Sequence, residues 1–212
     1  MNRFTTVRKG VVWFLLGGLC FTISQPLLRL PLLDYLQQSG DFLLTATLYP
    51  MMTGVGIAFS AGVFEEGFRF IFKSTLLRSP SCPFSQPLLF GLGHGVTEAA
   101  IVLIPALLAG RGIPLLGVAL LERALAIGLH IHLTVLVWNG VVRSKKVRYL
   151  LAAIAIHGTV NAAIPLFASH PNGVWIIESV LAVVVLILSV HTIYSKRFYT
   201  LTGGEQHVEK QE

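Results

Sequence analysis

Ionisable side chains stand inside long apolar stretches of this sequence, where a charge is costly. Glu65, Glu66 and Arg69 lie within five positions of one another, and Asn161 follows His157 by four. Placing a charge at the centre of a bilayer costs about 2.5–3.5 kcal/mol on insertion scales. Such side chains face one another or water, so each is a candidate for catalysis or transport.

A histidine surrounded by glycines marks the next apolar stretch. The run 91–95 reads Gly-Leu-Gly-His-Gly, with His94 at its fourth position, and Glu98 comes four positions after His94. Residues four apart share one face of a helix. The small glycines allow another helix or a substrate backbone to approach closely.

A further stretch adds polar groups that we expect to support the site. Glu122 and His130 fall on one helical stripe with Arg123 beside it, whereas His132 points away and is expected to be a helix contact. Glu122 and Arg123 are expected to brace the site. The supporting set is Glu98, Glu122, Arg123 and His130.

These residue types favour hydrolysis of a carbonyl compound. Glu65 could take a proton from water that then attacks the carbonyl, while Glu66 shares the proton or orients the water. His157 and Asn161 could donate hydrogen bonds to the developing oxyanion. His94 could orient the water or protonate a leaving amine. The candidate catalytic set is Glu65, Glu66, Arg69, His94, His157 and Asn161.

Composition indicates which elements position these groups. The chain has 212 residues, of which 54% are hydrophobic and 12% charged, against about 25% charged in soluble domains. Its apolar runs are about 20 residues long, as crossing a hydrocarbon core of about 30 Å requires. The sequence therefore predicts an all-α, polytopic membrane domain over residues 1–199 and a polar, disordered tail over residues 200–212. The six predicted spans are Val11–Leu30, Pro50–Leu77, Leu88–Ala109, Ile113–Val142, Val147–Phe167 and Val174–Tyr194.

The basic residues that give the net charge of +6 lie between the apolar runs. This is the positive-inside pattern of a multi-pass protein of the cell membrane, with both termini in the cytoplasm, and it argues against nucleic-acid binding. On this topology Arg29 and Arg111 flank the outer side, and residues 41–49 form an interfacial or re-entrant piece. Rise per residue puts Glu65, His94 and their partners at a similar depth, which predicts one polar cavity opening toward the cytoplasmic half.

Three motifs in order resemble the signatures of glutamic-type intramembrane proteases, a group that includes the CAAX prenyl-protein endopeptidases and the bacterial CPBP proteins. They are Glu65-Glu66-x-x-Arg69, Phe90-x-x-x-His94 and His157-x-x-x-Asn161. The glycine-rich run around His94, Glu98 and the Glu122-Arg123 pair resemble the YhfC branch of membrane peptidases more closely. The resemblance covers about residues 55–165. It implies that Glu65 activates water, that Glu66 and Arg69 support it, that His94 helps to hold the water, and that His157 and Asn161 form the oxyanion site.

The leading hypothesis is a metal-independent intramembrane endopeptidase without a cofactor. Its substrate would be a membrane-embedded or membrane-proximal peptide, and its other partner the lipid bilayer. The first alternative is an ion- or proton-coupled transporter that uses the same buried groups. A metallopeptidase is the next, because His94, Glu98, His130 and Glu65 are plausible metal ligands. A catalytically inactive scaffold is the last.

Overall fold

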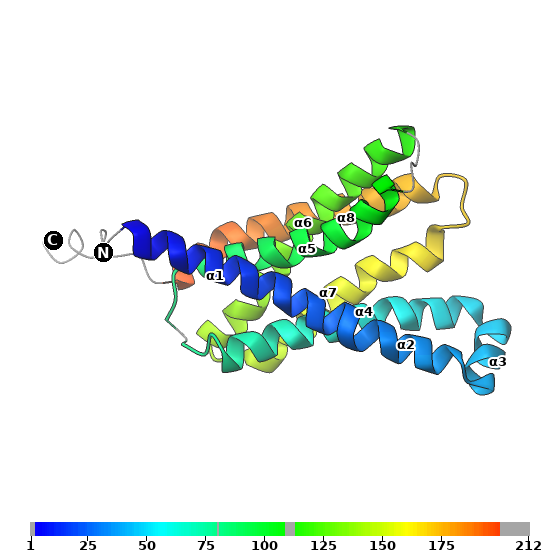
Figure 1. Cartoon of the computed structure of the whole chain (residues 1–212), viewed down its shortest axis with the longest axis horizontal. Helices are drawn as coiled ribbons and strands as arrows, with labels where there is room; N and C mark the ends of the chain where they lie inside the picture. Colours follow the sequence, from blue (N-terminus) through cyan, green and yellow to red (C-terminus); the bar gives the residue numbers. More distant parts are fainter. Residues whose placement is uncertain (1–2, 80, 109–112, 200–212) are drawn as a thin grey trace, which may run out of the picture.

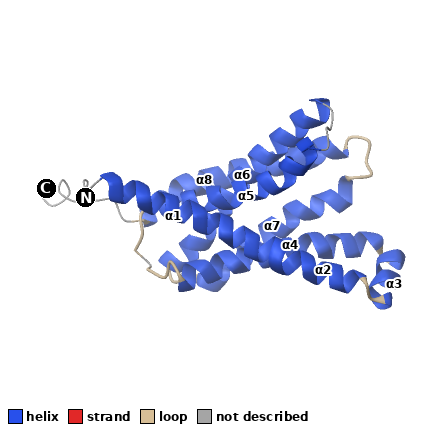
Figure 2. Cartoon of the chain, in the orientation of Figure 1, coloured by secondary structure: helices blue, strands red, loops and turns tan. Residues whose placement is uncertain are grey.

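The computed structural model describes residues 3–79, 81–108 and 113–199, and the regular structure in these ranges is helical throughout (Figure 2). The prediction of an all-α bundle is therefore confirmed. Arg111 and the predicted polar tail 200–212 lie outside the described residues.

Five helical stretches are long and apolar enough to cross a membrane, and a bent pair of helices makes up to six. The prediction of about six spans is thus confirmed, and the chain is a multi-pass membrane protein. The bent pair, which turns by 115°, joins α3 to α4, so residues 41–48 of the predicted interfacial or re-entrant piece belong to a short helix that leads into a span. The helices are α1 (Arg3–Thr22), α2 (Leu30–Gln37), α3 (Gly40–Leu48), α4 (Pro50–Thr75), α5 (Ser85–Leu108), α6 (Ile113–Val142), α7 (Lys146–Phe167) and α8 (Gly173–Ser195).

The first span is longer and less regular than predicted. A π-helical segment, Ile23–Arg29, joins α1 to α2 and contains Pro26, so that an apolar stretch runs from Val7 to Gln37. Proline has no backbone N–H to give to the preceding turn, and π-helical turns inside α-helices occur frequently at functional sites.

The helices form two groups that diverge toward the end of the molecule where α3 lies (Figure 1). One group contains α5, α6 and α8, and the other contains α4 and α7. The continuous helix formed by α1 and α2 crosses from the first group to the second. At the opposite end of the molecule α1 begins and α8 ends, as an even number of crossings requires. That this end faces the cytoplasm stays a prediction.

Glycines let the backbones of α1, α5 and α6 approach closely, as the sequence predicted for the run 91–95. A methyl group on Gly17 of α1 would collide with the carbonyl of Phe90, and one on Gly93 with the carbonyl of Phe14. Gly91 and Gly95 face α6 in the same way, against backbone atoms of residues 131 and 127. Small residues at such crossings are typical of helix pairs in membranes. The close fit fixes α1 and α6 relative to His94.

Candidate active site

Glu65 lies at the centre of a buried polar network between the two helix groups. Its side chain is only 3% exposed. The carboxylate oxygen Oε1 accepts a hydrogen bond of 2.6 Å from the amide of Gln25, and Oε2 lies 2.8 Å from Nε2 of His94. Oε2 is also 3.6 Å from Arg69. Because a buried carboxylate is stable only with such partners, these contacts explain how α4 tolerates an acid here.

Glu66 faces a different side of α4 and orients a second histidine. Its oxygen Oε1 accepts from Arg69 at 2.6 Å and lies 2.7 Å from Nδ1 of His157. All three side chains are almost completely buried. Since a carboxylate can only accept, His157 donates through Nδ1, and its other ring nitrogen, Nε2, is left for other contacts. Arg69 thus pairs more closely with Glu66 than with Glu65, although the sequence spacing favoured Glu65.

His130 of α6, predicted as a supporting residue, is brought next to Glu65. Its Nδ1 lies 2.6 Å from Arg69 and 3.8 Å from Glu65 Oε2, while its Nε2 contacts a carboxylate oxygen of Glu98. A guanidinium only donates, so Nδ1 is the acceptor and Nε2 carries the hydrogen toward Glu98. Glu98 in turn pairs with Arg123 at 3.1 Å.

The supporting pair of α6 is joined to this network at its edge. Arg123 also pairs with Glu122, whose side chain is 31% exposed. His132 contacts Thr192 and Ser189 of α8, both at 2.8 Å, and is the helix contact that the sequence predicted.

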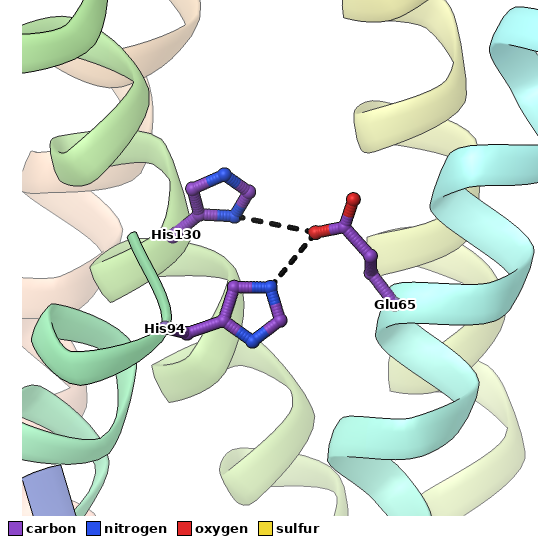
Figure 3. Close-up of side chains that lie close together, drawn as sticks. All are labelled: Glu65, His94 and His130. Carbon is purple, nitrogen blue, oxygen red and sulfur yellow. Dashed lines mark hydrogen bonds and ion pairs between the residues drawn. The ribbon is translucent and has the colours of Figure 1, made fainter. Parts of the chain in front are cut away.

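Glu65, His94 and His130 point toward one another from three helices (Figure 3). One ligand atom of each, Glu65 Oε2, His94 Nε2 and His130 Nδ1, lies within 4.8 Å of the other two. Two imidazole nitrogens and one carboxylate are the donor set of many catalytic zinc sites. A carboxylate on the far nitrogen of a histidine, as Glu98 stands to His130, is the usual outer-shell partner of such a ligand. The residues therefore fit a divalent metal ion, although Arg69 competes for Nδ1 of His130.

A cavity of about 490 Å³ opens from this network. Glu65, His130, His157 and the half-buried Asn161 line it beside mostly apolar side chains. The cavity continues along the first turns of α4 and the last turns of α7, toward the end of the molecule where α3 lies. On the predicted topology that end is the outer one, so the predicted cytoplasmic termini and the predicted opening of the cavity toward the cytoplasmic half cannot both hold. The depth estimate located the polar groups, but only the divergence of the helix groups shows where space remains.

Two functional candidates escaped the sequence analysis. Gln25 contacts Glu65 directly, and Arg29 binds Gln25 Oε1 at 3.0 Å through Nη1. Arg29 was expected to flank the outer side, but it is only 9% exposed and lines the cavity. Its position inside the protein follows from the length of the span, which continues to Gln37. The signal was present in the sequence as a glutamine and an arginine four residues apart, with a proline between them, in an apolar run.

The chain matches one family model, described as YhfC intramembrane metalloprotease, over residues 5–111 and 104–186. Together the matched segments include α1 from residue 5 onward and every residue of the network described above. No curated protein matches the chain.

Proposed function

The chain belongs to the YhfC family of intramembrane metalloproteases, and from this premise we propose that it hydrolyses a peptide bond of a membrane-embedded or membrane-proximal substrate at the Glu65 site. The observation that carries the proposal is the convergence of Glu65, His94 and His130 from three helices at the wall of a cavity. The same cavity is lined by His157 and Asn161, which are suitable for proton transfer and hydrogen bonding to a carbonyl.

We propose that Glu65, His94 and His130 hold a divalent metal, with zinc as the first candidate. Bound there, the metal would act as a Lewis acid on the scissile carbonyl and would make water a better nucleophile. Glu98 would keep His130 in the tautomer that offers Nδ1, since Glu98 accepts the hydrogen of Nε2. Arg69 would balance the negative charge of the neighbouring glutamates.

His157 is suited to move the proton of the reaction. Its Nδ1 hydrogen bonds to Glu66, which fixes the tautomer and would stabilise the imidazolium, as the acid does in an Asp–His pair. Nε2 can then accept a proton from the attacking water and pass it to the amine that leaves. Asn161 lies one helical turn after His157 on the same cavity wall, where its amide can donate to the carbonyl oxygen of the substrate.

One pair of contacts favours a second mechanism on the same residues. Glu65 already hydrogen bonds to His94 at 2.8 Å, and Arg69 already occupies Nδ1 of His130. In that mechanism Glu65 itself takes the proton from water, no metal takes part, and His157 with Asn161 stabilises the oxyanion. This is the glutamic-type reaction that the sequence motifs resemble.

The test is a cleavage assay on the purified full chain in lipid nanodiscs. Single-span peptides would be incubated with the wild type, with Glu65→Gln and with Glu178→Gln as a control that removes an intramembrane carboxylate of α8. New termini would be identified by mass spectrometry, and bound zinc by elemental analysis. We expect cleavage by the wild type and the control, loss of cleavage and of zinc in Glu65→Gln, and reversible inhibition by a zinc chelator.

The other outcomes decide between the mechanisms or refute the site. Cleavage that continues in chelator but stops in Glu65→Gln would replace the metal mechanism by the glutamic-type one. Equal cleavage by wild type and Glu65→Gln would show that the network around Glu65 is not the active site. Absence of cleavage in every sample, together with passage of ions or protons across the membrane, would favour a transporter.

A further inference from the structure

We infer that Gln25 is a positioning residue of this site, and that Arg29 fixes Gln25 for that task. The amide of Gln25 holds Glu65 so that the oxygen Oε2 faces His94 and His130. The inference rests on the proposed function, because it assigns to Gln25 the orientation of the residue proposed as ligand or base.

The contacts define the direction of each hydrogen bond. Arg29 donates to Oε1 of Gln25 at 3.0 Å, so the other end of that amide, Nε2, must face Glu65. Nε2 donates to Oε1 of Glu65 at 2.6 Å. Gln25 is 6% exposed, which protects both bonds from competition by water. Arg29 is itself fixed, because it also donates to Ser60 at 2.9 Å and to the carbonyl of Ile57 at 2.6 Å.

The same arrangement occurs at two histidines of the network, His130 and His157. His130 is held by Glu98, which is bound by Arg123. His157 is held by Glu66, which is bound by Arg69. In each case a site residue is oriented by a second polar side chain, and an arginine binds that second side chain. Gln25 and Arg29 give Glu65 the third such support.

The backbone of the first span is shaped to deliver these two side chains. Gln25 and Arg29 both lie in the π-helical segment Ile23–Arg29, and their side chains bond to each other four residues apart. In α1, which precedes this segment, Gly17 packs closely against the backbone of α5. The segment therefore carries Gln25 from the α5 side of the molecule to Glu65 on α4.

The first experiment tests whether Gln25 and Glu65 are coupled, and it does not require activity. Melting temperatures would be measured in nanodiscs for the wild type, Gln25→Met, Glu65→Met and the double variant, since methionine at position 65 keeps a similar length but offers no carboxylate oxygen. The control is Thr22→Val, since Thr22 lies in the same helix and, among the described residues, its hydroxyl bonds within its own turn, to the carbonyl of Gly18. We expect Gln25→Met to lower Tm clearly in the presence of Glu65 and much less in the Glu65→Met background, where the acceptor of the Gln25 hydrogen bond is absent.

The second experiment tests the positioning role with zinc as the probe. Outer-shell partners of metal ligands typically contribute about 10–100-fold to affinity, so Gln25→Met should raise the Kd for zinc by about that factor, whereas Thr22→Val should leave it unchanged. Arg29→Met should act in the same direction and replaces Gln25→Met if that variant does not fold. If cleavage proceeds without metal, the same factor is expected in kcat at an unchanged KM.

The inference would be overturned if the change in Tm of the double variant equalled the sum of the changes in the two single variants. It would also be overturned if Gln25→Met had the same zinc Kd, or the same kcat, as Thr22→Val. If the wild type neither binds zinc nor cleaves any peptide, the proposed function fails instead. The melting temperatures then still decide the inference. Non-additive changes in Tm would keep Gln25 as the partner that holds Glu65, and additive changes would refute it.

Discussion

Adding one methyl group at Gly93 should separate α1 from α5 and disturb the active site from a distance. The methyl carbon of Gly93→Ala would lie 2.7 Å from the carbonyl carbon of Phe14, about 1 Å inside the ~3.5–4.0 Å at which non-bonded carbons rest. Both helix backbones are involved, so a rotamer change cannot relieve the clash. Overpacking of this kind typically costs about 1–3 kcal/mol.

The separation has two measurable consequences. For a domain of this size a loss of 1 kcal/mol lowers Tm by about 2–4 °C, so we expect Gly93→Ala to melt about 2–12 °C below the wild type. A displacement of about 1 Å at a catalytic group can cost about 10²-fold in rate, and α1 leads directly into the segment that carries Gln25. Cleavage should therefore fall by up to that factor in folded protein at low temperature.

The matched control is Gly67→Ala, because a methyl group on Gly67 of α4 would meet no atom within 4 Å. Alanine is favoured over glycine in a helix by about 1 kcal/mol, so this variant should be at least as stable as the wild type and equally active. Differential scanning fluorimetry in nanodiscs and the peptide cleavage assay give the two measurements. Equal Tm and activity for Gly93→Ala and Gly67→Ala would refute the close packing of α1 on α5.

Three further predictions follow from other parts of the structure. Glu98→Gln should weaken zinc binding by about 10–100-fold because it removes the charged partner of His130, whereas Glu122→Gln should change zinc binding little. Equal zinc affinities of the two variants in titrations would contradict this prediction. Asn161→Ala should lower kcat by about 10²–10³-fold at a nearly constant KM if the amide of Asn161 binds the oxyanion. Steady-state kinetics in which the variant shows only a higher KM would exclude that role. Lys73→Met should lower Tm, because the fully buried ammonium group donates to the carbonyls of residues 77 and 79, both at 2.9 Å, and a hydrogen bond to a charged group contributes about 1.5–3 kcal/mol. Lys145→Met, at an exposed position, is the control, and equal melting curves would contradict the prediction.

The sequence predicted the helices and the depth of the polar groups because both depend on local pattern. An acid or a histidine within an apolar run is visible in one dimension, and a rise of about 1.5 Å per residue gives its level in the membrane. Glu65, His94 and His157 were recognised in this way.

Which polar side chains pair with one another was harder to predict from the sequence, because it depends on the rotation of each helix about its axis. His94 and Glu98 share a helical face, yet His94 contacts Glu65 and Glu98 contacts His130. The distance of Arg69 in sequence favoured Glu65, but the closer bond is to Glu66. Gln25 was missed since an uncharged amide in an apolar run has little weight in a search for titratable groups.

The shape of the molecule restricts how a substrate can reach the network. Glu65 of α4 contacts Gln25, His94 and His130 at one level and so links the two helix groups there. Beyond that level the groups diverge around the cavity. A substrate must therefore arrive from the end of the molecule where α3 lies or from the lipid beside the diverging helices. Inside a membrane a peptide bond is normally enclosed in a helix, because each backbone polar group needs a partner. If hydrolysis takes place at Glu65, as proposed, the substrate must unwind near that residue, and the freed N–H and C=O groups need new partners. Asn161 and Arg29 both line the cavity and can supply these partners, which would explain why the polar wall extends beyond the residues proposed to act in the reaction.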